Sequence, residues 1–97
     1  MATFVVLANF TEKGVQEAKD TITRADKFKD MAKKAGITVK DMYWTLGAWD
    51  TVTICEAPDE EAVTALSLSV SARGFVKTQT MRAFSASEMK TILGKLA

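Results

Sequence analysis

The segment from Tyr43 to Asp59, YWTLGAWDTVTICEAPD, constrains the fold more than any other part of the chain. Residues that favour β structure lie on both sides of residues 47–50, and this pattern predicts a β-hairpin with strands over 37–46 and 51–57. Pro58 follows the second strand and precedes three acidic residues. This order is typical of a helix start, because proline fits the first turn and carboxylates favour the positive end of the helix dipole.

The flanking segments extend the predicted order to βαββαβα. A β-rich run predicts a first strand over 3–10, and helical spacing of apolar residues predicts a helix from 12 to about 35. We expect a kink or restart of this helix near Thr21–Thr23, since Thr23-x-x-Asp26 resembles a capping box. A second helix is expected to about residue 72, a last strand over 75–84, and a short helix capped by Ser85-x-x-Glu88. The apolar stripe of the first helix comprises Val15, Ala18, Ile22, Ala25, Phe28, Ala32 and Ala35.

This order predicts an α+β, ferredoxin-like fold, in which two helices cover one face of a four-stranded antiparallel sheet and a C-terminal helix follows. Apolar residues are predicted on both faces of that sheet, because Phe4 and Val6 alternate with Val5 and Leu7. Leaving one apolar face in water is costly, so we expect the sheets of two or more copies to pack face to face in a homo-oligomer. The second strand is expected to place Met42, Trp44 and Leu46 on one face and Ile37, Val39 and Tyr43 on the other.

Size and charge narrow the class of protein. The 97 residues match one domain over 1–97, and 13 basic against 12 acidic residues give a net charge of +1, which argues against nucleic acid as a partner. No apolar run approaches the ~20 residues that span a bilayer, so no membrane role is predicted. Cys55 has no partner for an internal disulfide, and we expect a cytoplasmic protein. The chain has no histidine, and we predict neither a metal site nor a cofactor.

The hairpin motif, followed downstream by ARGFVKTQTMRAF, resembles the GYD domain family. The resemblance implies a dimeric α/β barrel and covers nearly the whole chain; it implies no settled activity. Trp49 stands where the family usually has tyrosine, so a role that needs a phenol hydroxyl is not available there. The matching residues are Thr45, Leu46, Gly47, Asp50, Glu56, Ala57, Pro58, Asp59, Thr80, Arg82, Ala83 and Phe84.

Two carboxylates in this region have alternative interpretations. Gly47 is expected to supply a positive φ to the turn, and Asp50 either binds nearby backbone amides or serves as a general base or ligand acceptor. Glu56 lies in an apolar strand, where a carboxylate needs a partner. It is either paired with Arg82, Arg73 or a base of another copy, or located at an exposed strand end, or catalytic.

Aromatic residues complete the candidate site. Tyr43 and Trp44 are consecutive in a strand and must point to opposite faces, where each either packs or orients a small molecule. Cys55 is interpreted as a small buried hydrophobe, since no histidine is present to activate it. The candidate ligand-binding residues are Tyr43, Trp44, Trp49, Asp50, Glu56 and Arg82, and no catalytic residue is assigned.

Two functions remain open. The first is a non-catalytic oligomeric module that binds a small ligand or a partner protein, in a cavity of a few hundred Å³ between sheet and helices or at the subunit interface. The alternative is a cofactor-independent enzyme, of monooxygenase or isomerase type, acting on a small aromatic or carbonyl compound. Such an enzyme would use Tyr43, Asp50 or Arg82 to polarise the substrate. The missing histidine favours the binding module.

Overall fold

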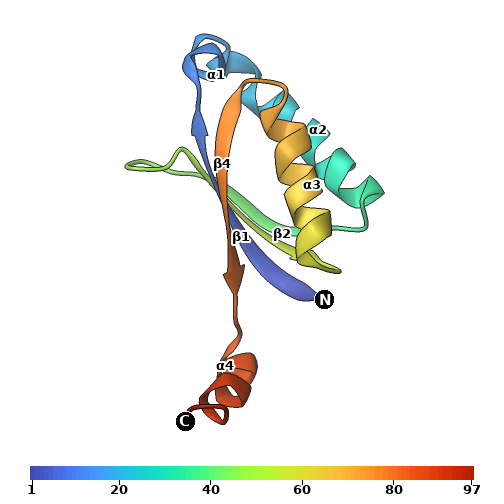
Figure 1. Cartoon of the computed structure of the whole chain (residues 1–97). Helices are drawn as coiled ribbons and strands as arrows, with labels where there is room; N and C mark the ends of the chain where they lie inside the picture. The colour runs from blue at the N-terminus through green and yellow to red at the C-terminus, as the bar shows by residue number, and fades with distance from the viewer.

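The computed structural model describes all 97 residues and has the predicted order of elements. Four strands form one sheet, and α2 and α3 lie together on one of its faces (Figure 1). The elements are β1 Ala2–Phe10, α1 Glu12–Gln16, the 3-10 turn η1 Ala18–Asp20, α2 Thr21–Lys34, β2 Thr38–Trp44, β3 Thr51–Ala57, α3 Glu60–Ser71, β4 Val76–Ala83 and α4 Ala86–Leu93.

The sheet has the strand order β2-β3-β1-β4, and every neighbouring pair is antiparallel. Val5 in the central strand β1 lies opposite Ile54 of β3 and Met81 of β4. The two βαβ halves are thus interleaved, which is the ferredoxin-like arrangement predicted from the sequence.

The hydrophobic core lies between the sheet and the two long helices. Phe4 of β1 and Cys55 of β3 point into it, and Val63 and Leu66 of α3 cover them from the helix side. Burial of each Val, Leu or Phe side chain contributes roughly 1.5–3 kcal/mol to stability, so these contacts hold the helices on the sheet. The remaining members of the core are Val6, Ala32, Ile37 and Ala57.

The other face of the sheet has no element covering it and is apolar at its centre. Val5 and Leu7 alternate with the buried residues of β1 and are half-buried, and so are their β3 neighbours Val52 and Ile54. Tyr43 lies beside Val52 on this face and is 59% exposed. The prediction that both faces carry bulky apolar groups is confirmed, and this uncovered surface is called the open face below.

The second strand departs from the predicted alternation. A bulge between Val39 and Asp41 shifts the register of β2 against β3. Val39 therefore lies on the helix-covered face together with Met42, and it does not share a face with Tyr43 as we had expected. Leu46, expected on the strand, lies in the following loop and is fully exposed.

The first helical segment is also interrupted. Thr11 ties the start of α1 to the start of β4, with its amide donating to the Phe75 carbonyl at 3.0 Å and its hydroxyl donating to the Gly74 carbonyl at 2.5 Å. The chain must turn after α1 to cover the sheet, and it restarts as α2 at Thr21. Because of this break, Val15 and Ile22 are exposed instead of continuing one apolar stripe.

The restart was predicted near the observed position, but its cap was not. Asp20 is the N-cap of α2 and its side chain makes no capping hydrogen bond, while Thr23 lies inside the helix.

Asp59 caps α3 by accepting from the Ala62 amide at 2.8 Å, and the predicted capping box of Ser85 and Glu88 is present at α4. Figure 1 places α4 beyond the end of β4, away from the sheet and the other helices. No helix is long and apolar enough to cross a lipid bilayer.

Candidate functional site

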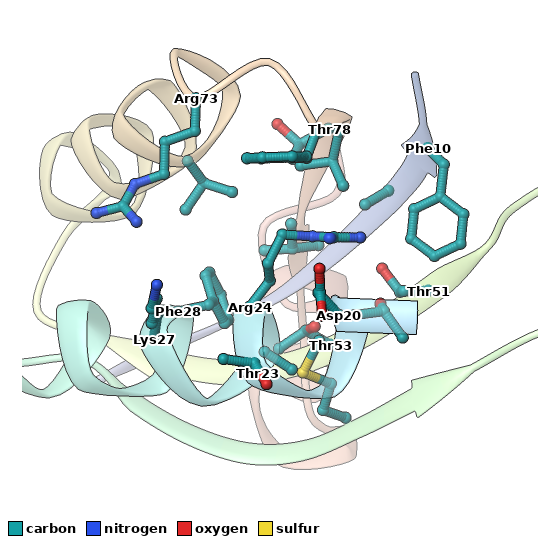
Figure 2. Close-up of a pocket in the computed structure, with 18 of the residues that line it drawn as sticks. Phe10, Asp20, Thr23, Arg24, Lys27, Phe28, Thr51, Thr53, Arg73 and Thr78 are labelled. Carbon is teal, nitrogen blue, oxygen red and sulfur yellow. The ribbon is translucent and has the colours of Figure 1, made fainter. Parts of the chain in front are cut away.

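A cavity of about 290 Å³ lies between the sheet and the helices α2 and α3 (Figure 2). The sequence led us to expect a cavity of a few hundred Å³ either between sheet and helices or at a subunit interface, and the structure has one in the first of these places. Its lining comes from β1, η1, α2, β2, β3, the end of α3 and β4. The lining residues are Val6, Ala8, Phe10, Glu17, Asp20, Thr21, Thr23, Arg24, Ala25, Lys27, Phe28, Met31, Met42, Thr51, Thr53, Val70, Arg73, Phe75, Val76 and Thr78.

The floor of the cavity is formed by small side chains on the sheet. Thr51 and Thr53 of β3 are 6% and 3% exposed, and beside them lie Val6 and Ala8 of β1. Opposite them α2 presents Ala25, which is also small. Short side chains on both layers leave the space between them unfilled, in contrast to the close packing usual in a protein interior.

The mouth of the cavity carries charged side chains. Arg24 and Lys27 come from α2, and Arg73 follows α3; Figure 2 shows Lys27 and Arg73 on one side of the cleft, with Arg24 extending between them and Phe10. The molecule has two ion pairs, Lys40–Glu56 and Arg82–Glu88, and neither involves a cation of the mouth. The carboxylates at the mouth, those of Glu17 and Asp20, are on exposed residues.

Arg24 is held in place by backbone and aromatic contacts. Its Nη1 donates to the Glu17 carbonyl at 2.7 Å and its Nη2 to the Gly14 carbonyl at 3.5 Å. The guanidinium carbon lies 4.6 Å from the centroid of the Phe75 ring, and Lys13 Nζ lies 4.4 Å from the same centroid. The Arg24 guanidinium is therefore oriented before any ligand binds, and its Nη1 and Nη2 each already donate one hydrogen bond.

Asp50, a predicted site residue, serves the loop instead of the cavity. Its Oδ2 accepts from the Phe10 amide at 2.8 Å, and its own amide donates to the Ala8 carbonyl and to Asn9 Oδ1. These bonds fasten the β2–β3 loop to the end of β1. The predicted positive φ of Gly47 is confirmed at +124°.

The aromatic candidates lie on separate surfaces. Tyr43 is on the open face, while Trp44 Nε1 donates to Thr21 Oγ1 of α2 at 3.0 Å, so the two side chains point to opposite faces as predicted. Thr21 lines the cavity, and Trp44 therefore touches its edge without lining it. Trp49 is half-buried in the loop, where its carbonyl accepts from Thr45 Oγ1.

The two remaining candidates form ion pairs with partners that the sequence did not indicate. Glu56 pairs with Lys40 at 3.6 Å, and not with Arg82 or Arg73, because Lys40 is brought beside it by the pairing of β2 with β3. Arg82 pairs with Glu88 of α4 at 2.7 Å and also donates to the carbonyls of Thr3 and Ala83. None of the six predicted residues lines the cavity.

Cys55 lies in the core, as predicted. Its side chain is 0% exposed, and burial raises the pKa of the thiol above its ordinary value. A neutral, enclosed thiol is a packing group and not a nucleophile. No cluster of three or more His, Cys, Asp or Glu side chains is arranged to hold a metal ion.

Some of the cavity residues that were not predicted have a weak signature in the amino-acid sequence. Thr51 and Thr53 alternate with Val52 and Ile54, which places short polar side chains on the face that the helices cover. Threonine at two successive core positions indicates space that the core does not fill. No sequence pattern indicated Arg24 as a cavity residue, because its position in space depends on the break between α1 and α2.

The fold and the cavity define a class of small α+β domains with a four-stranded antiparallel sheet and a cleft under two helices. A crystal structure of TTHA0845 from Thermus thermophilus has this fold, with a TM-score of 0.64 at 19% identity over 89% of this chain and 96% of that one. The crystal structure of FFRP-DM1 is similar, with a TM-score of 0.60 at 17% identity over 87% of this chain and 100% of the other.

The sequence places the chain in one family of that class. The GYD domain model matches residues 4–93, and the chain belongs to the GYD domain family. A Thermus thermophilus relative is 30% identical over 90 residues, which are 92% of this chain and 95% of the relative. That relative is named glutamine synthetase and cystathionine beta-lyase binding protein.

Proposed function

We propose that this single-domain chain is a non-catalytic binding protein. In this proposal its subunits assemble through the open face, the assembly docks on a partner enzyme, and the cavity takes a small ligand. The observation that carries the proposal is the uncovered apolar surface of the sheet, whose central residues Val5 and Ile54 have no covering element in the single chain.

The ends of the open face support assembly with a second copy. Lys77 lies opposite Asn9 at one end of β1, and Glu56 lies opposite Thr3 at the other end. When two such faces pack about a two-fold axis, Lys77 of one copy can meet the Lys40–Glu56 ion pair of the other, so that polar groups surround the apolar centre. The apolar centre and the charged ends together fit a specific interface.

Partner docking is supported by the relative and by α4. The Thermus relative is named for binding two enzymes, glutamine synthetase and cystathionine beta-lyase, and we propose a partner of the same kind here. The arm formed by residues 84–97 presents Phe84, Leu93 and Leu96, which are 53%, 52% and 71% exposed. An arm with uncovered apolar groups is a suitable docking element.

We also propose a cytoplasmic location, since a single cysteine is compatible with a reducing compartment.

The geometry favours binding over the enzymatic alternative. An enzyme using Tyr43, Asp50 or Arg82 would need these groups at the substrate, yet all three lie outside the cavity lining. Asp50 is bound to the Phe10 amide and Arg82 to Glu88. The side chains of Asp50 and Arg82 are thus held in hydrogen bonds that stabilise the fold.

The partner proposal is tested by titrating the purified chain against purified glutamine synthetase and cystathionine beta-lyase of the same organism in an interferometric assay. We expect saturable binding to at least one enzyme. Leu93→Ser on the arm should weaken it, whereas Ile22→Ser should not, because Ile22 is an equally apolar exposed residue on α2. Absence of binding to both enzymes, or equal effects of the two variants, would contradict docking through the arm.

A further inference from the structure

The cavity joins an apolar interior to a mouth with three unpaired cations, and this combination indicates the chemistry of its ligand. We propose that it binds a small organic acid, with the carboxylate at Arg24 and an apolar or aromatic body among the interior side chains. This inference rests on the proposed binding function and specifies the ligand class. The 290 Å³ volume lies at the small end of ligand sites, which restricts the ligand to a compact molecule.

Arg24 is the group that recognises the carboxylate. Its two hydrogen bonds go to backbone carbonyls, so its positive charge is not neutralised by a side chain. A guanidinium has five N–H donors, and those that remain can bind both oxygens of a carboxylate. The two hydrogen bonds and the position over the Phe75 ring restrain the guanidinium, so little conformational freedom is lost when the ligand binds.

The other charges at the mouth decide between kinds of anion. Lys27 and Arg73 add positive charge without ion-pair partners, which attracts an anion to the entrance. Glu17 and Asp20 at the same mouth repel a second negative charge. A monoanionic carboxylate fits this balance better than a phosphate dianion does.

The interior accepts the rest of the ligand. Phe28 and Met31 of α2, Met42 of β2 and Val70 of α3 provide apolar contacts. Thr53 on the floor, which is 3% exposed, contributes a small polar side chain to the lining. A flat apolar body with one small polar group would match these walls and this floor.

The test uses 3-phenylpropionate as the probe and the neutral 3-phenylpropanamide as its matched analogue, with binding followed by calorimetry. Fluorescence in a Trp49→Phe background gives a second signal, because Trp44 is bonded to Thr21 at the cavity edge. We expect the acid to bind about tenfold or more tightly than the amide. Equal binding of the two probes, or stronger competition by inorganic phosphate than by the acid, overturns the carboxylate assignment.

Variants locate the binding within the cavity. Arg24→Gln should reduce the affinity for the acid to the affinity for the amide. Lys27→Gln, at an exposed position, should reduce the affinity for the acid to a smaller extent. Lys29→Gln is the control, since Lys29 is an exposed α2 residue outside the lining. Unchanged acid binding in both Arg24→Gln and Lys27→Gln overturns the proposal.

Filling the cavity separates interior binding from surface binding. Val70→Phe enlarges a half-buried α3 side chain that lines the cavity, and it should abolish binding of both probes while the thermal unfolding transition is retained. Full affinity in this variant, or no binding of the acid to the wild-type chain, overturns the ligand assignment. Neither result bears on partner docking, which the interferometric assay measures separately.

Discussion

At the scale of single residues, Gly14 shows how a missing side chain permits a contact. A Cβ atom at Gly14 would lie 2.1 Å from the Phe75 carbonyl oxygen, and a backbone atom cannot move aside cheaply. Gly14→Ala should therefore lower the free energy of unfolding by roughly 1–3 kcal/mol, measured by chemical denaturation. Gly94→Ala is the matched control, because its Cβ would be 3.4 Å from the nearest carbonyl oxygen; equal losses in both variants would refute the steric explanation.

Asp50 offers a second prediction at this scale. Removing its carboxylate in Asp50→Ala leaves the Phe10 amide without its 2.8 Å acceptor, and we expect a loss of about 1–2 kcal/mol in unfolding free energy. Asp50→Asn keeps an acceptor oxygen and should lose less. Since Phe10 lines the cavity, Asp50→Ala should also weaken binding of 3-phenylpropionate. A wild-type denaturation midpoint in Asp50→Ala would show that the hydrogen bond is dispensable.

At the scale of elements, the start of α4 is sensitive to acid. The backbone hydrogen bond from Ser85 and the contact with Arg82 hold the pKa of Glu88 below its ordinary value of 4.5. Because the folded pKa is lowered, the ionised carboxylate stabilises α4 fully above the ordinary pKa, and this stabilisation is lost as pH falls through the lowered pKa. NMR chemical shifts of the α4 amides, followed from about pH 6 to about pH 3, should report loosening at the acid end.

The variant Glu88→Gln isolates this titration. It removes the ionisable group while keeping an oxygen acceptor for the Ser85 amide, so the α4 shifts should lose their pH dependence over the same range. Residues 84–97 contain no other acidic side chain. An acid response of equal size in Glu88→Gln would assign the loosening to another part of the molecule.

At the scale of the whole molecule, the open face predicts association. We expect the chain to sediment as a dimer or larger oligomer, and Ile54→Glu should shift it toward the 10.6 kDa monomer by placing a charge in the apolar centre of the face. Leu68→Glu is the control, since Leu68 is 67% exposed on α3, the helix side of the sheet. A wild-type chain that sediments only as a monomer would contradict assembly through the sheet.

Much of the fold was predictable from the sequence, because strand-forming runs and helix-capping residues lie where the strands and helices of the structure begin and end. Strand β3 was predicted with its observed bounds, and Asp59 and Ser85 mark helix starts through side chains that bind backbone amides three residues away. Such signals depend on neighbours in sequence. The bulge in β2 was not predictable, because a register shift depends on how Val39 and Asp41 meet the adjacent strand.

The residues that line the cavity were not predicted, for the same reason. Asp50, Glu56 and Arg82 looked available as functional groups, but each has a partner distant in sequence or on another element that uses its charge for structure. The cavity is lined jointly by α2 and by Thr51 and Thr53 of β3, which are distant in sequence, so its lining depends on how these elements pack.

The order of the elements and the apolar pattern on both sheet faces could be read from the amino-acid sequence alone, because periodicity and capping act over a few residues. The motif of residues 43–59 likewise indicated the family. The side chains that meet at the cavity, and the charges that have no ion-pair partner, were identified only in the folded molecule. Those properties depend on contacts such as that between Arg24 and Phe75, which join segments far apart in the chain.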